Sequence, residues 1–342
     1  MKLFMPERVF FEPSSLKYPL GRELYNFFEE KGVEIIETPL QNVSKSIPGK
    51  DERQKYARSK KTLVVTTKKS MSLDVCKPSA DFEFSLATNC PGNCEYCYLQ
   101  TTQGLKPYLR TYVNLDDIFN SIKRHIEKNE NRITTFEAAS SSDPLSLEHI
   151  TGSLAKTIEF IGGIENARLR VVTKFDNVDS LLHLKHNGHT RFRVSINSRH
   201  VIKTFEHNTA SFEERLEAAA KIAAAGYPIG FIVAPIMVYE GWKEEYRELF
   251  EGLKQHTAVK LSPEPVTFEL IQHRFTLTAK KFILQRFPGT KLDMDESKRT
   301  LKWGKFGRFK YVYPKETANE MKTYIKSLVE ENFPDGEIEY FT

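Results

Sequence analysis

Short apolar runs alternate with amphipathic segments from about residue 82 onward, which indicates strands followed by helices. Strands are predicted at 82–87, 132–137, 168–174, 191–196 and 229–234 and near 258–270. Helices are predicted between them at 115–128, 148–161, 178–186, 211–225 and 242–254. This alternation is typical of a parallel sheet with helices on its outside. Six such units favour an open, partial (β/α)6 barrel over a closed eight-fold one.

The helix predicted at 211–225 has sequence signals at both ends. Ser211 is followed three residues later by Glu214, which predicts a capping box at the start. Gly226 and Pro228 come directly after the last periodic residue, as is common after a helix.

Three stretches are expected along the chain. Residues 1–80 precede the strand–helix repeat and form an N-terminal appendage, 81–290 form the partial barrel, and 291–342 form a basic hairpin and a helix. In an open parallel sheet, the site is expected at the carboxyl ends of the strands.

Composition narrows the class of protein. The chain has 342 residues, of which 40% are hydrophobic and 28% charged, a normal globular balance. No run of about 18 apolar residues is present and the first residues lack the apolar core of a signal peptide, so a cytoplasmic protein without a membrane span is expected. The net charge of +5 is too small to establish an anionic partner, and the basic stretch 45–69 is, like most charge runs, consistent with a solvated face.

Three of the four cysteines, Cys90, Cys94 and Cys97, lie within eight positions in "NCPGNCEYCYL". Pro91 and Gly92 make this stretch a loop, and it follows the first predicted strand. Three thiolates can hold three irons of a four-iron, four-sulfur cluster and leave the fourth iron open to a small molecule. A zinc site would need a fourth ligand, and buried inert thiols are a third possibility.

The segment "CPGNCEYC" has the Cys-x3-Cys-x-aromatic-Cys form and resembles the radical S-adenosylmethionine superfamily, over about residues 82–270. The resemblance implies a [4Fe-4S] cluster whose open iron chelates S-adenosyl-L-methionine. One electron from the reduced cluster then cleaves a carbon–sulfur bond of this cofactor. The 5′-deoxyadenosyl radical that is released takes a hydrogen atom from the substrate.

Within that superfamily, the chain resembles the spore photoproduct lyase family almost from end to end. The resemblance rests on "CPGNCEYCYLQTT", "SSSDPLSLEH", "VVTKF" and the basic C-terminal segment. It implies repair of 5-thyminyl-5,6-dihydrothymine, the thymine dimer of ultraviolet-damaged DNA, in the core of a bacterial spore. It also implies a small-protein or chemical electron donor.

The same resemblance assigns cofactor contacts at the strand ends. They are Ser142, Asp143, Lys174, Ser195 and Ala234, together with Tyr96 and Tyr98 in the loop. Lys174 would pair with the cofactor's carboxylate, Ser195 would bind its ribose or amino acid part, and the Ala234 backbone would meet the adenine. A serine or lysine at a strand end is more often an ordinary solvated residue.

The family mechanism also requires that a hydrogen atom be returned to the departing thymine. In the family a cysteine donates it, and two tyrosines, here Tyr96 and Tyr98, relay the radical back to deoxyadenosine. The donor position is Ser140 in "EAASSSDP", and a serine O–H is a much poorer hydrogen-atom donor than a thiol. Cys76 is the fourth cysteine, and we expect either that it substitutes for the donor or that it is a small buried residue.

The segment 298–313, "KRTLKWGKFGRFKYVY", alternates basic and aromatic residues around Gly304 and Gly307, which suggests a hairpin. Its basic side chains would neutralise DNA phosphates, and its aromatic ones would stack against an extruded lesion. The expected contacts are Lys298, Arg299, Lys302, Trp303, Lys305, Phe306, Arg308, Lys310 and Tyr311. A solvated hairpin at the barrel edge is the simpler alternative.

Two other functions remain open. Another radical enzyme of nucleic acids, such as a methylthiotransferase, would normally need a second cluster, for which three further cysteines are absent from the chain. A non-catalytic DNA-binding protein with a structural metal is the second. The oligomeric state does not follow from the sequence.

Overall fold

The computed structural model describes the chain except residues 1, 130–131, 139, 257–260 and 304–308. The described strands are β1 Arg8–Phe11, β2 Glu34–Glu37, β3 Thr62–Thr66, β4 Asp74–Val75, β5 Phe82–Glu83, β6 Ala87–Thr88, β7 Asn93–Cys94, β8 Leu109–Tyr112, β9 Thr134–Glu137, β10 Ala167–Thr173, β11 Thr190–Ile196, β12 Glu206–His207, β13 Ile229–Ile236, β14 Thr267–Gln272, β15 Thr300–Trp303, β16 Phe309–Val312 and β17 Glu337–Phe341.

The described α-helices are α1 Pro19–Glu30, α2 Val43–Ser46, α3 Glu52–Ser59, α4 Leu99–Thr102, α5 Leu115–Glu127, α6 Glu148–Thr151, α7 Ser153–Gly162, α8 Arg199–Phe205, α9 Phe212–Ala224, α10 Trp242–Gln255, α11 Leu277–Arg286 and α12 Lys315–Asn332. None of the helices in the described part of the chain has the length and apolar composition needed to span a bilayer.

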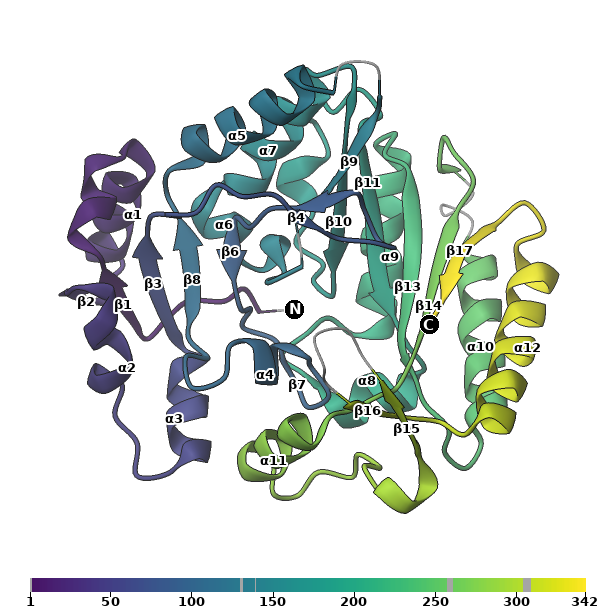
Figure 1. Cartoon of the computed structure of the whole chain (residues 1–342). Helices are drawn as coiled ribbons and strands as arrows, with labels where there is room; N and C mark the ends of the chain where they lie inside the picture. The colour runs from purple at the N-terminus through teal and green to yellow at the C-terminus, as the bar shows by residue number, and fades with distance from the viewer. Residues whose placement is uncertain (1, 130–131, 139, 257–260, 304–308) are drawn as a thin grey trace.

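The main sheet has eight strands in the order β17-β14-β13-β11-β10-β9-β5-β4. All neighbours are parallel except β4 and β5 at one edge. Figure 1 shows this sheet curled, with α5 and α7 on one outer flank and α10 and α12 on the other. The prediction of an open parallel barrel is confirmed.

Packing explains why these strands lie at the centre. β11 is buried along almost its whole length, and β10 alternates between buried and half-buried residues. The interior also contains charge, because Arg193 on β11 is fully buried and forms ion pairs with Glu137 on β9 and Glu269 on β14. A buried guanidinium is tolerated when such partners compensate its lost hydration.

A second sheet has the order β2-β1-β3-β8-β6 and begins in the N-terminal appendage. β1, β2, β3 and β8 are parallel, and β6 is antiparallel to β8. Its last two strands come from the chain after residue 81, so the appendage and the barrel region share this sheet. The domain limits near residues 80 and 290 stay predictions.

Three expected elements differ from the structure. The strand expected at 82–87 is divided between β5 and β6, which belong to different sheets, because Phe84 and Leu86 turn into the core between them. The helix expected at 148–161 is divided into α6 and α7 at Gly152, which has a left-handed φ of 58°. The helix expected at 178–186 is only a short 3-10 turn at Asp179–Leu181, in which Leu181 is buried.

The other expected helices and strands lie within a few residues of their expected limits, except the strand expected near 258–270. In its place β14 begins only at Thr267, and residues 257–260 lie outside the described part of the chain. The capping box of α9 is confirmed: the Glu214 N–H donates to Ser211 Oγ, and the Ser211 N–H donates to the Glu214 carboxylate. Trp303 pairs with Phe309 across an antiparallel hairpin, as predicted for the basic segment.

Candidate active site

The cysteine loop begins at the carboxyl ends of the parallel strands. Asn89 forms a parallel bridge with Ser142, just beyond β9, and its N–H donates to the Ser141 carbonyl at 2.7 Å. Farther along the loop, β7 pairs antiparallel with β12, so that Cys94 lies opposite Glu206. The loop is therefore attached to the barrel rim at both of these points.

The three loop thiols lie close enough to influence one another electrostatically. Burial raises the pKa of Cys90 to about 11 and also raises the pKa of Cys94 and Cys97. None of the four cysteines forms a disulfide. The thiols thus keep their protons until a metal binds and displaces them.

A single-metal site is not found among the described His, Cys, Asp and Glu side chains. A four-iron cluster does not require one, because each cysteine binds a different iron. The residues present fit such a cluster: three cysteines lie on one anchored loop, and a fourth protein ligand would occupy the iron that the cofactor needs.

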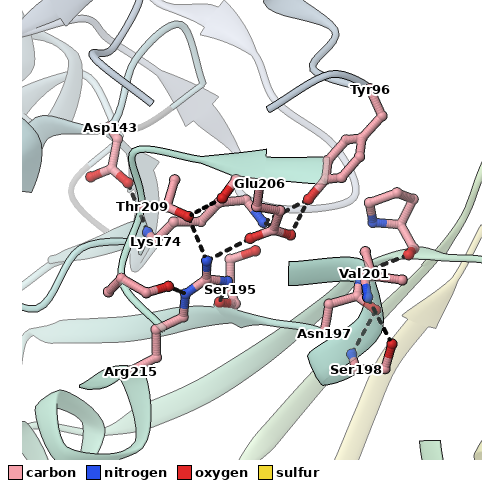
Figure 2. A network of polar contacts seen from close by, with 12 residues as sticks. Tyr96, Asp143, Lys174, Ser195, Asn197, Ser198, Val201, Glu206, Thr209 and Arg215 are labelled. Carbon is pink, nitrogen blue, oxygen red and sulfur yellow. Dashed lines mark hydrogen bonds and ion pairs between the residues drawn. The ribbon is translucent and has the colours of Figure 1, made fainter. Parts of the chain in front are cut away.

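Lys174 connects the strand ends to this loop. Its Nζ lies 2.9 Å from Glu206 Oε1 and 3.1 Å from Tyr96 Oη, and Tyr96 donates its phenol proton to the same carboxylate. Figure 2 shows these three side chains converging. One carboxylate therefore positions both the lysine and the loop tyrosine.

Arg215, on α9, forms a buried ion pair with Glu206. Its Nη2 lies 2.5 Å from Glu206 Oε2, and neither side chain is exposed. Arg215 also donates to the carbonyls of Ser195 and Ala210, as part of the network in Figure 2. Burial alone would raise the pKa of Glu206, but Arg215 and then Lys174 lower it to about 2. Glu206 is consequently an anion at any physiological pH.

The strand-end residues differ in what they offer a cofactor. Ser142 is buried and its Oγ has no partner among the described residues, so it is an orphaned polar atom at the rim. Ser195 is buried near the end of β11. Ala234 falls in the register shift between Val233 and Ile236, which leaves its backbone outside the ladder of β13 and β14. The cofactor contacts expected of these three positions stay predictions.

Asp143 is hydrogen-bonded to the end of β10. Its carboxylate accepts hydrogen bonds from Thr173 Oγ1 at 2.9 Å and from the Lys174 N–H at 2.8 Å. Burial raises its pKa to about 6. The side chain is thus anchored to the end of β10 and supports the position of Lys174, and its contact with a cofactor stays a prediction.

The two tyrosines of the loop are also unlike each other. Tyr96 is held in the Glu206 network, whereas the Tyr98 side chain is 57% exposed. Tyr98 lies within electrostatic range of both Cys97 and Cys76. The structure therefore brings Tyr98, the cluster loop and the fourth cysteine into one neighbourhood.

Cys76 lies beside Ser140, the position at which the resemblance places a donor cysteine. Its Sγ is 3.4 Å from Ser140 Oγ, although the two residues are 64 positions apart in the chain. Burial, together with the neighbouring Glu83 carboxylate, raises the pKa of this thiol to about 11. Cys76 thus carries its hydrogen at neutral pH.

The hairpin β15–β16 presents an apolar face and a basic face. Trp303 and Phe309 lie opposite each other and are exposed, with their rings edge to face at 4.8 Å. Lys302 is opposite Lys310 on the other face, and the Lys298 side chain is 66% exposed. Gly304, Lys305, Phe306, Gly307 and Arg308 lie outside the described residues.

Two expected DNA contacts are engaged within the protein. Arg299 is buried, lies 3.7 Å from the centre of the Tyr313 ring and donates to the carbonyls of His273 and Asp293. The prediction that Arg299 contacts DNA is thus wrong, because its buried guanidinium is hydrogen-bonded within the protein at the base of the hairpin. Tyr311 stacks one face on Phe275, which leaves only part of its ring for another partner.

Several residues that shape the site were not found from the sequence. Arg215 had a usable signal, since it interrupts the apolar face of α9 between Phe212 and Leu216, where a charge implies a buried partner. Glu206 had none, because nothing in its local sequence marks it as the anion that Arg215 and Lys174 share.

The curled parallel sheet and its three-cysteine loop define a radical S-adenosylmethionine enzyme. The family model for spore photoproduct lyase matches residues 4–342. The chain belongs to the spore photoproduct lyase family.

Individual relatives agree over the full length. The spore photoproduct lyase of Geobacillus sp. (strain Y412MC61) is 52% identical, with 100% of both chains covered. A solved spore photoproduct lyase complexed with dinucleoside spore photoproduct matches at a TM-score of 0.97 and 51% identity, again over 100% of both chains. A mutant spore photoproduct lyase with bound AdoMet and dinucleoside spore photoproduct matches at a TM-score of 0.95 and 51% identity, with 100% of both chains covered.

Proposed function

We propose that this chain repairs the spore photoproduct 5-thyminyl-5,6-dihydrothymine in ultraviolet-damaged DNA, using a [4Fe-4S] cluster and S-adenosyl-L-methionine. The observation that carries the proposal is the junction of β7 with β12. It places Cys94 of the cysteine loop opposite Glu206, whose side chain holds Lys174 and Tyr96. Cluster ligands and a cation for the cofactor's carboxylate thus meet at one rim.

Cys90, Cys94 and Cys97 would hold the cluster, which, with the cofactor, supplies a 5′-deoxyadenosyl radical to the site when bound. Lys174 has its ammonium at the rim, where it can share its charge between Glu206 and a cofactor carboxylate. Ser142 offers the unpartnered hydroxyl, and Ala234 offers backbone outside the strand ladder. Lys174, Ser142 and Ala234 would bind or orient the cofactor without changing their protonation state, whereas the three thiols would lose their protons on binding the cluster.

Return of hydrogen to the departing thymine requires a donor near the lesion. Ser140 cannot readily provide one, because a hydroxyl holds its hydrogen more strongly than a thiol does. Cys76 supplies the thiol instead: it adjoins Ser140 Oγ at 3.4 Å and retains its proton. Tyr98, within range of Cys76, and Tyr96, beside Lys174, would carry the radical back toward the cofactor.

DNA would approach the rim across the hairpin β15–β16. Lys298, Lys302 and Lys310 would contact phosphates, as would Lys305 and Arg308, which lie outside the described residues. Exposed Trp303 would stack beside the extruded lesion, together with Phe306, and Tyr311 would contribute the part of its ring not packed on Phe275. Basic residues of 45–69 are exposed on α3, namely Arg53, Lys55 and Arg58, and form a second candidate surface. A small-protein or chemical electron donor and a location in the spore core belong to the same proposal.

The direct test uses anaerobically reconstituted protein. It is reduced and incubated with S-adenosyl-L-methionine and either lesion-containing or undamaged DNA, and released thymine and 5′-deoxyadenosine are quantified. Thymine should appear only with the lesion. Cofactor cleavage without thymine release from lesion DNA would point to another nucleic-acid substrate, and the absence of cofactor cleavage would contradict the radical mechanism.

A further inference from the structure

Lys60 is a buried lysine that comes from outside the barrel. It is the C-terminal cap residue of α3, just before β3, and is 8% exposed. Its ammonium donates to Asn89 Oδ1 at 3.1 Å and to the backbone carbonyl of Cys90. Among the described residues it forms no ion pair with a carboxylate, whereas its neighbour Lys61 pairs with Glu7 at the surface.

The acceptors that hold Lys60 are themselves fixed. Asn89 has a left-handed φ of 63°, and its Oδ1 also accepts the Cys90 N–H at 3.0 Å. Its Nδ2 donates to the Pro107 carbonyl, and its N–H donates to the Ser141 carbonyl. The ammonium is therefore docked on a rigid turn that begins the cysteine loop.

The ammonium of Lys60 lies directly against the backbone of a proposed cluster ligand. It donates to the carbonyl of Cys90, and it shares Asn89 Oδ1 with the Cys90 N–H. A buried cation without a counter-charge is costly, so its position calls for an anion nearby. The thiolates of the cysteine loop, and the cluster that they would hold, would supply that anion.

We propose that Lys60 is a positioning and charge-compensating residue of the iron–sulfur site, by which the N-terminal appendage raises the reduction potential of the cluster. Reduction adds an electron to an already anionic group, and a fixed cation stabilises the reduced form more than the oxidised form. Net charge and hydrogen bonding around a cluster are known determinants of its potential. The inference rests on the cluster of the proposed function and extends it to residue 60.

The test compares Lys60→Met with Lys61→Met as a matched control. Reconstituted proteins are titrated by electron paramagnetic resonance at controlled potentials, without S-adenosyl-L-methionine or DNA. At the wild-type midpoint, Lys60→Met should show an approximately tenfold lower ratio of reduced to oxidised cluster, which for one electron is about 59 mV. Lys61→Met should retain the wild-type midpoint.

Two further variants separate charge from shape. Lys60→Arg keeps the charge and should stay near the wild-type midpoint, whereas Lys60→Gln keeps a donor without the charge and should shift like Lys60→Met. If Lys60→Met does not fold, as judged by circular dichroism, Lys60→Gln carries the same comparison. Equal midpoints for wild type and the neutral variants would overturn the proposal, as would an equal shift in Lys60→Arg. A wild-type protein that holds no four-iron cluster would instead contradict the proposed function.

Discussion

Cys76 Sγ lies 3.4 Å from Ser140 Oγ, across the gap between β4 and the end of β9. The chain thus has serine at the position where the resemblance places the donor cysteine, and it carries a thiol immediately beside that position. Hydrogen-atom transfer depends on where an S–H group can reach, so a thiol at either of these two adjoining positions should be able to serve the same lesion.

Cys76→Ser should lower the yield of clean thymine and divert the product radical to solutes or small reductants. The first hydrogen abstraction should persist, because it depends on the cluster and cofactor. Ser140→Cys should raise the clean yield. The measurement is product analysis by mass spectrometry for wild type, both single variants and the double variant.

The double variant is the internal control for this pair. With Ser140→Cys present, Cys76→Ser should have little effect, since the restored thiol provides the hydrogen. If Cys76→Ser leaves the product distribution of the wild-type background unchanged, Cys76 is a bystander. If Ser140→Cys also changes nothing, the donor lies elsewhere.

The pH dependence of hydrogen return should reflect the raised pKa of the Cys76 thiol. Burial and Glu83 raise the pKa of Cys76 to about 11, compared with about 8.5 for a free cysteine. Only the protonated form can donate a hydrogen atom, so the clean fraction of product should stay constant from about pH 7 to about pH 10. Product ratios, rather than rates, isolate this step. A loss of clean product centred near pH 8.5 would show that the donor is a more exposed thiol.

Cys97→Ala should reduce iron binding and abolish cleavage of S-adenosyl-L-methionine, because the cluster would lose one of its three protein ligands. Iron and sulfide analysis after reconstitution measures the first effect. Cys76→Ser is the matched control and should retain close to the iron content of the wild type. Full iron content and cofactor cleavage in Cys97→Ala would show that another residue completes the site.

Replacing Lys302, Lys305 and Arg308 with alanine should weaken DNA binding and reduce its log–log salt slope by up to about three units. Each lost phosphate contact removes roughly one released counterion. Fluorescence anisotropy at several salt concentrations gives the slope, and Lys221→Ala, which breaks a surface pair with Asp179, is the control. An unchanged slope would transfer the DNA site to the basic residues of 45–69.

Glu206→Gln should destabilise the fold by about 3–5 kcal/mol, since it leaves the buried Arg215 without its anion. Glu213→Gln, which disturbs the exposed pair with Arg199, should cost less than about 1 kcal/mol. Chemical denaturation measures both. Because Glu206 has a pKa lowered to about 2, its contribution is present above its unfolded pKa near 4.5 and is lost as the pH falls through 2. Glu206→Gln should therefore lose less stability in acid than the wild type, and equal acid sensitivity would argue against this pairing.

Local sequence determined the parts of this protein that depend on neighbours in the chain. The capping box of Ser211 and Glu214 and the apolar strand β11 each form from contiguous residues, so their patterns predicted them. The cysteine spacing is equally local, and for this reason the loop could be assigned before the fold was known. The prediction of one strand at 82–87 was nevertheless wrong. The segment crosses from one sheet to the other, and only the arrangement of the two sheets decides where that crossing occurs.

Tertiary structure alone decided which distant residues share a site. Glu206 joins Lys174, Arg215 and Tyr96 across as many as 110 positions of the chain, and Lys60 reaches Cys90 across 30. Arg299 shows that tertiary structure can also remove a residue from a predicted site. It lies in a basic segment but is buried against the Tyr313 ring. Such outcomes depend on burial and on charge compensation between elements that meet only after folding, and neither is encoded by the spacing of residues along the chain.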